Sequence, residues 1–356
     1  MKGHSNFAFD GIKKALSARE LSSFLFVVAL FLIVGAVSPG FLAPGNLFLT
    51  LNSSVVFTML AAGTAFIIIC GEIDVSLGAI MGLTAAVSGS MIRDGSSWGA
   101  AIAAALLIGI VCGAINGLGH VFLKIPSIIM TLGTAGIIRG LIYVFTNGKW
   151  VENIPPDFKW LSQLNFLNIS LFYWAALVLC VACMLVMSLT KHGCYFSAVG
   201  DNINCAIFLG VPVKTTKAAA FVIAGVFYSV AGLMFVSRIG FVTPVAGAGY
   251  EMKAIAACVL GGVSLSGGVG SLVGAAVGAL FMASVGRILV FLNSSADDNV
   301  ITGIMLLVIV TADAMLQQNA VEKARRTRLS AKTERAGVTQ NVAAKITAQG
   351  VTPDAV

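Results

Sequence analysis

The chain has 356 residues, of which 58% are hydrophobic and only 10% are charged. Soluble domains carry about 25% charged residues, so this composition excludes a soluble protein and indicates an integral membrane protein made of many helices. A membrane β-barrel is also excluded, because its strands alternate in short segments and do not form long apolar runs. The net charge of +7 comes mostly from residues 1–20 and 317–356, yet no folded basic domain is present, so we expect no nucleic-acid partner.

Ten apolar stretches are candidate membrane spans, since a span needs about 20 apolar residues. We interpret the first as an uncleaved helix and not as a signal peptide, because Pro39 stands where cleavage would be expected and more spans follow. The third and eighth stretches are short or glycine-rich and are predicted to be broken or half-helices. The ten stretches are 21–38, 53–70, 76–92, 99–122, 127–146, 171–190, 216–236, 252–264, 270–291 and 299–316.

The loop charges agree with ten crossings that start from a cytoplasmic N-terminus. The first loop, 38–52, falls outside and has no Lys or Arg, whereas the lysine-bearing loops 120–126 and 191–217 fall inside. Arg93 and Arg238 are exceptions, since both fall outside. The predicted fold is therefore an all-α integral membrane protein with about ten transmembrane helices and both termini in the cytoplasm.

The chain divides into three predicted regions. These are a cytoplasmic N-terminal segment (1–20), a transmembrane domain (21–316) and a basic, disordered cytoplasmic tail (317–356).

Two acidic residues, Glu72 and Asp74, lie between apolar stretches, within the segment from Gly71 to Gly78. A carboxylate at membrane depth costs several kcal/mol unless it faces protein, water or a partner. The flanking glycines allow the backbone to leave the helix, and Asp74 or Ser76 can cap the helix that follows. Two readings stay open: a structural break, and a direct role of Glu72, Asp74 and Ser76 in gating or translocation.

A weak internal echo relates residues 71–78 to residues 261–268, because glycine, β-branched or aliphatic residues and serine recur at the same spacing. In transporters, interrupted segments at matching places mark the translocation route. Chance similarity in a chain with 39 glycines is the alternative. Glycine stripes with a spacing of four, at 109–117 and 270–278, predict close helix packing.

Arg139 lies deep in the fifth predicted span, where it must find a carboxylate or carbonyl groups. Asp74 and Glu72 are its candidate partners. Asn116 in the fourth span and Thr131 in the fifth can hydrogen-bond between helices. We include Asn116, Thr131 and Arg139 among the candidate translocation and gating residues.

The polar segment 191–217 differs from the other loops. Asp201 or Asn202 can cap a short amphipathic helix that Gly210 ends and that Pro212 prevents from continuing. Such a helix on the cytoplasmic side suits docking of a partner, and the alternative is an interfacial helix that lies on membrane lipid.

No catalytic role is expected for this chain. It has no G-x-x-x-x-G-K-[ST] sequence, so it cannot bind ATP through a P-loop, and it has no H-E-x-x-H metal motif. We predict a non-enzymatic protein without a metal or cofactor.

Several segments together resemble the membrane permease subunit of bacterial ABC importers for simple sugars, the ribose-permease-like family. The resemblance covers roughly residues 45–315 and adds Glu251 to the candidate gating residues. The matching stretches are Gly71–Gly78, Gly113–Gly117, Ile125–Thr134 with Arg139-Gly140, Ala198–Asn202 with Gly210-Val211, and Gly249–Ala257 with Gly261–Gly268.

The resemblance implies a multi-pass permease of the bacterial inner membrane that translocates a simple sugar. Its implied partners are a second permease (the same chain or a sister chain), two cytoplasmic ATPase subunits and an extracytoplasmic binding protein. Gly200, Asp201, Asn202 and Gly210 would belong to the element that contacts the ATPase. Glu72 departs from the family, which more often has Gly at this position.

Two alternatives to a sugar importer remain at this point. One is a proton- or ion-coupled secondary transporter, in which Glu72, Asp74 and Arg139 form a relay at broken helices. The other is an ABC permease for amino acids or nucleosides.

Overall fold

The computed structural model describes residues 38–291 continuously, together with residues 25, 28–29, 31–36, 300, 303–304, 307 and 311. The chain divides into two units, Met1–Leu306 and Leu307–Val356, and only residues 307 and 311 of the second are described. The predicted N-terminal segment 1–20 and the tail 317–356 lie outside the described residues, as does most of the first and tenth predicted spans.

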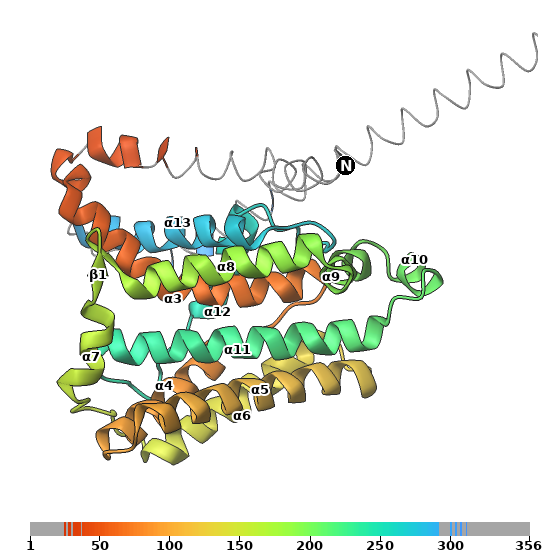
Figure 1. Ribbon diagram of the computed structural model, residues 1–356, viewed down its shortest axis with the longest axis horizontal. Coiled ribbons are helices and arrows are strands. Elements are labelled where there is room, and N and C mark those ends of the chain that lie inside the picture. The colour runs from red at the N-terminus through yellow and green to blue at the C-terminus, as the bar shows by residue number, and fades with distance from the viewer. Residues whose placement is uncertain are drawn as a thin grey trace, which may run out of the picture. The chain divides into compact units, whose positions relative to one another are not determined.

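The described part of the first unit is almost entirely helical (Figure 1). Six helices are long and apolar enough to cross a membrane, which confirms a helical membrane fold: α3, α5, α6, α8, α11 and α13. Two shorter helices, α4 and α12, coincide with the third and eighth predicted spans. The bounds are α3 Pro44–Ile69, α4 Leu77–Arg93, α5 Trp98–Phe122, α6 Ser127–Thr146, α8 Leu171–Leu189, α11 Val213–Ile239, α12 Tyr250–Leu260 and α13 Leu272–Phe291, after a 3-10 turn, η1, at Pro39–Leu42.

One end of this unit carries structure that the sequence analysis did not predict. The loop at 147–170 contains helix α7 (Pro156–Gln163) and a small antiparallel hairpin of β1 (Asn165–Phe166) and β2 (Ile169–Ser170). Leu167 and Asn168 form its turn with positive φ angles of 55° and 62°. We call this the hairpin end, which Figure 1 shows at the left.

The opposite end carries two short helices, α9 (Lys191–Asp201) and α10 (Ile203–Phe208), and we call it the α9–α10 end (Figure 1). The loop between α5 and α6 and the start of α11 lie at this end, since Glu72, just after α3, contacts both His120 and Lys217. The lysine-bearing loops thus share one end of the unit, as the loop charges predict.

Helix α3 forms the centre of the unit. It packs against α8, α11, α12 and α13, and most of its residues are buried. A helix that is apolar all round belongs in such a position. Helices α6 and α8 have mostly exposed apolar side chains, as expected for helices that face lipid or another membrane chain.

Both glycine stripes allow close helix packing, as predicted. Gly109 and Gly113 on α5 lie against the backbone of α11 at Gly225 and Phe221, where a Cβ would collide with a carbonyl oxygen. Gly278 on α13 lies in the same way against the carbonyl oxygen of Ala257 on α12. Small residues at these positions bring the backbones together, so the stripes are structural.

Candidate functional site

The helix break at residues 71–76 is the centre of the candidate site. Helix α3 ends at Ile69, Gly71 turns the chain with a φ of 78°, and α4 begins only at Leu77. Side chains of α6 satisfy two backbone N–H groups of this irregular segment. Ile73 N donates to Ser127 Oγ at 3.3 Å and Val75 N donates to Thr131 Oγ1 at 3.1 Å. Irregular backbone is tolerated in a membrane protein only where it is buried and bonded in this way.

Asp74 is only 1% exposed and anchors a chain of hydrogen bonds. Its Oδ1 accepts from the backbone N of Ser76 at 2.7 Å and from Ser76 Oγ at 2.6 Å. Asn116 Nδ2 donates to Ser76 Oγ at 2.8 Å, and Thr134 Oγ1 donates to Asn116 Oδ1 at 2.7 Å. The network therefore joins the break to α5 and α6. Asp74 caps the start of α4, whereas the side chain of Ser76 makes no capping bond.

Tyr228 on α11 completes this network, and the sequence analysis missed it. It is fully buried, its hydroxyl interacts with the Asp74 carboxyl, and it lies 3.4 Å from Thr64 Oγ1 of α3. A buried tyrosine hydroxyl needs a polar partner, so a lone Tyr inside an apolar span was the available signal. No short motif links it to Asp74, which lies far away in the sequence.

Arg139 finds both a carboxylate and a carbonyl group, but the predicted carboxylate partners were wrong. Its Nη2 donates to Glu251 Oε1 at 3.0 Å and its Nη1 donates to Ala246 O at 3.0 Å. Arg139 lies eight residues beyond Thr131 on α6, which is about 12 Å along the helix axis. Because Thr131 bonds the break itself, Arg139 lies too far along α6 to pair with Glu72 or Asp74.

The first turns of α4 and α12 meet at this pair. Gly78 of α4 lies against the carbonyl oxygen of Gly247 and the carboxylate of Glu251, in the first turn of α12. Gly82, one turn on, lies against Ala246 O. With 11 residues, α12 spans only about 16 Å, half of the ~30 Å hydrocarbon core, so it has the length of a half-helix.

Each of these two helix starts carries an acidic residue, Asp74 at α4 and Glu251 at α12. Negative groups are favourable at the positive end of a helix. Broken helices whose N-termini point at one place form the solute sites of many transporters. This arrangement can bind or pass a polar solute.

Glu72 lies in a separate cluster toward the α9–α10 end. Lys217 Nζ pairs with its Oε1, and His120 Nε2 lies 3.1 Å from the same oxygen. Burial acts to raise the pKa of the Glu72 carboxyl, but the bonds from His120 and Lys217 outweigh it and lower this pKa to about 2. The three members of the predicted proton relay, Glu72, Asp74 and Arg139, thus bond to different partners and do not form one chain.

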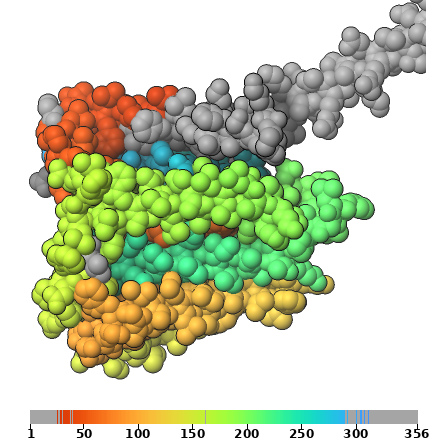
Figure 2. Space-filling model, viewed as in Figure 1, coloured from red at the N-terminus to blue at the C-terminus, as the bar shows by residue number. Residues whose placement is uncertain are grey.

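The segment of the predicted docking element forms two helices where one was expected. Asn202 Oδ1 accepts from Cys205 N at 3.0 Å, so Asn202, and not Asp201, caps α10. Gly210 follows with a φ of 74° and ends this element. Phe208 and Leu209 are 91% and 79% exposed. Figure 2 shows this segment projecting beyond the neighbouring helices.

Gly200 on α9 connects the docking element to both helix breaks. It lies against Ile69 O at the end of α3 and against Gly268 N in the loop before α13, where a Cβ would not fit. Gly268 N in turn donates to Ile69 O at 2.9 Å, and Gly267 lies against Gly71. The two echo segments, 71–78 and 261–268, therefore contact each other, and α9 rests on both.

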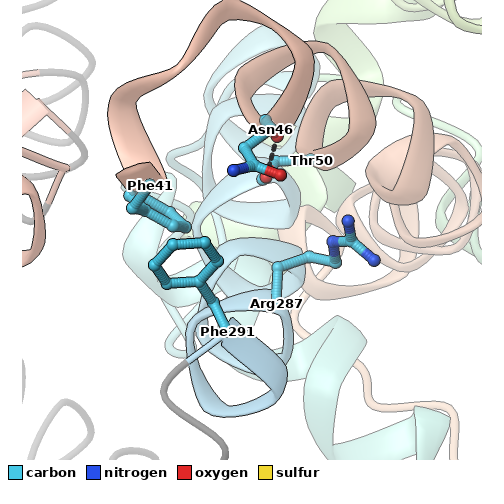
Figure 3. A pocket seen from close by; sticks show the side chains of 5 residues that line it. All are labelled: Phe41, Asn46, Thr50, Arg287 and Phe291. Carbon is cyan, nitrogen blue, oxygen red and sulfur yellow. Dashed lines mark hydrogen bonds between the residues drawn. The ribbon is translucent and has the colours of Figure 1, made fainter. Parts of the chain in front are cut away.

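A small cavity of about 50 Å³ lies at the hairpin end, away from every predicted site residue (Figure 3). Phe41 and Phe291 form one wall, and Arg287 borders it beside Asn46 and Thr50 on α3. It does not belong to the candidate site.

Residues 46–310 match the family described as "branched-chain amino acid transport system / permease component". Three relatives carry the name autoinducer 2 import system permease protein LsrC. The Enterobacter sp. (strain 638) protein is 42% identical over 308 residues, which are 86% of this chain and 90% of the relative. The Salmonella typhi and Escherichia coli (strain K12 / DH10B) proteins are 40% and 38% identical over 300 residues, 84% of this chain and 86% and 88% of the relatives. No solved structure matches the chain.

Proposed function

Because this chain belongs to the permease component family of branched-chain amino acid transport systems, we propose that it is the permease subunit of an ABC importer for autoinducer 2 or a similar sugar-like solute. The observation that carries this proposal is the similarity of 38–42% to autoinducer 2 import permeases over most of both chains. The family description names amino acids, but these relatives favour a sugar-like solute. The membrane is the bacterial inner membrane, which the chain crosses several times.

The geometry supports a permease that depends on other subunits. The starts of α4 and α12 supply the solute route near Asp74, Ser76, Arg139 and Glu251. ATP hydrolysis belongs to separate cytoplasmic ATPase subunits, which bind at α9 and α10. An extracytoplasmic binding protein delivers the solute at the hairpin end, and a second permease, the same chain or a sister chain, completes the pore. Ten crossings with both termini in the cytoplasm fit the grouping of the lysine-bearing loops at one end.

The alternative of an ion-coupled secondary transporter is not favoured. Its relay would need Glu72, Asp74 and Arg139 to exchange a proton, but Arg139 pairs with Glu251 and Glu72 pairs with Lys217. Transport driven by a separate ATPase needs no such relay.

Uptake of labelled autoinducer 2 tests the proposal. Cells without their own autoinducer 2 permease would express this chain together with its binding protein and ATPase, and excess unlabelled ribose or leucine would compete. We expect ATP-dependent uptake that stops when the ATPase is omitted. Uptake that persists without any ATPase would overturn the importer proposal, and competition by leucine alone would identify an amino-acid permease.

A tagged chain, purified in mild detergent from its native membrane, gives a second test. We expect a P-loop ATPase to copurify in near-equal amount. Recovery of the chain alone, even after crosslinking, would contradict the proposed assembly.

A further inference from the structure

A second cavity, of about 330 Å³, lies at the α9–α10 end between the end of α5 and the start of α11. Four basic side chains line it: His120, Lys124, Lys214 and Lys217. Aliphatic groups, among them Ile125 and Pro126, form the rest of its wall. The solute route between α4 and α12 does not use this cavity.

The cavity carries an excess of positive charge. Glu72 is the carboxylate that bonds this cluster, and it engages Lys217 and His120. His120 Nδ1 lies 2.8 Å from Ile125 O, so both ring nitrogens face acceptors and the ring holds two protons. Four cations thus face one carboxylate. Lys124 and Lys214 are exposed, and within the described part of the chain neither takes part in an ion pair.

Apolar side chains next to the cavity face outward. Phe122 and Leu123 are 66% and 69% exposed and directly precede Lys124. Ile129, near the start of α6, is 63% exposed. A belt of exposed apolar groups that gives way to lysines marks the level where lipid tails meet headgroups.

We propose that this cavity binds the phosphate of an anionic phospholipid headgroup, with Lys124 and Lys214 as its main contacts. Basic pockets between transmembrane helices are suited to such headgroups. The adjacent exposed apolar side chains accommodate the acyl chains, and they favour a lipid over a soluble phosphate as the source of the phosphate group. Glu72 limits the site by neutralising part of the charge of Lys217 and His120.

Native mass spectrometry of the full chain in detergent tests this proposal, with phosphatidylglycerol and phosphatidylcholine added at equal amounts. We expect the parent chain to retain phosphatidylglycerol in preference to phosphatidylcholine. The double variant Lys124→Gln/Lys214→Gln should bind phosphatidylglycerol roughly 30-fold more weakly, since each lysine near an anionic surface contributes a factor of about five. The control Lys149→Gln/Lys191→Gln changes net charge equally outside the cavity and should bind as the parent does. Both lysine pairs are exposed, so thermal unfolding should be similar for the two variants without lipid.

Three results would overturn the proposal: equal retention of the two lipids, unchanged phosphatidylglycerol binding in Lys124→Gln/Lys214→Gln, or equal losses in both double variants. A further arm adds inorganic phosphate at the same concentration as the lipid. Displacement of phosphatidylglycerol by inorganic phosphate would identify a site for soluble phosphate and would also overturn the lipid assignment. In the variant Glu72→Gln, which frees Lys217 and His120, we expect tighter phosphatidylglycerol binding.

Discussion

Glu72 and Asp74 are two residues apart, yet their surroundings differ in almost every respect. Asp74 is 1% exposed, and the groups that bond it are neutral: Ser76 and Tyr228. Glu72 lies toward the α9–α10 end and is bonded by two cationic groups, Lys217 and His120. One carboxylate therefore fixes an irregular backbone by hydrogen bonds, and the other joins helices by charge.

The difference teaches that one short acidic segment serves two parts of the molecule. The network of Asp74 holds the start of α4 in place against α5, α6 and α11, where a solute route is proposed. The cluster of Glu72 ties the end of α3 to α5 and α11 beside the lysine-rich end. Changes at Asp74 should therefore affect transport most, and changes at Glu72 least.

The largest effect is expected from Asp74→Ala. It leaves the N–H and Oγ of Ser76 without their acceptor, and each hydrogen bond to a charged group contributes about 1.5–3 kcal/mol. We expect uptake of labelled solute to be lost while the protein still inserts in the membrane. Normal uptake by this variant would mean that the break has no functional role.

Asp74→Asn serves as the matched control for this change, because its amide oxygen can still accept the two bonds from Ser76. Partial uptake by Asp74→Asn would show that bonding of the backbone matters more than charge. Uptake as low as that of Asp74→Ala would show that the charge itself is required.

The next effect concerns the contact of α9 with the helix breaks. A Cβ at Gly200 would collide with Ile69 O, and overpacking of this kind costs about 1–3 kcal/mol. Gly200→Ala combined with charge reversal, Asp201→Lys, should separate the chain from its ATPase in a copurification assay. Gly133→Ala is the control, because nothing lies near the position of its Cβ. An intact complex would show that residues 198–212 are not the docking element.

A moderate effect is expected at the pair Arg139 and Glu251, both of which are partly buried. Arg139→Gln or Glu251→Gln leaves one charge without its partner, whereas the double variant removes both charges. We expect each single variant to lower the unfolding temperature more than the double variant does, with a coupling energy of about 1–2 kcal/mol in the double-mutant cycle. Additive losses would mean that the two side chains do not interact in the membrane.

The fold could be predicted from the sequence where apolar stretches have clear ends. Helix α6 begins and ends where predicted, since Pro126 precedes it and Asn147 follows in a left-handed conformation. Helix α3 begins at Pro44, nine residues before the predicted start at 53, because Asn46, Asn52 and two serines lower the local hydrophobicity. The proline in its first turn was the missed signal.

The candidate site could be predicted only in part. Asp74 and Ser76 are close in sequence, so their bond follows from local chemistry. The partner of Arg139 depends on how α12 enters the bundle, because Gly247 and Gly78 allow the two helix starts to touch. Hydropathy and spacing carry no information about that contact. The bond between Glu72 and Lys217 likewise joins residues 145 positions apart.

The smallest effect is expected from Glu72→Gly, which gives the residue that the resembling permeases more often have. The change removes a carboxylate that is only partly buried, and the lysine and histidine it leaves can turn toward water at the open cavity beside them. We therefore expect solute uptake within about twofold of the parent. Uptake as low as that of Asp74→Ala would show that the two acidic residues act together, and the contrast between them would then be wrong. Near-normal uptake in Glu72→Gly with loss in Asp74→Ala would assign the transport role of this segment to the buried hydrogen-bond network alone.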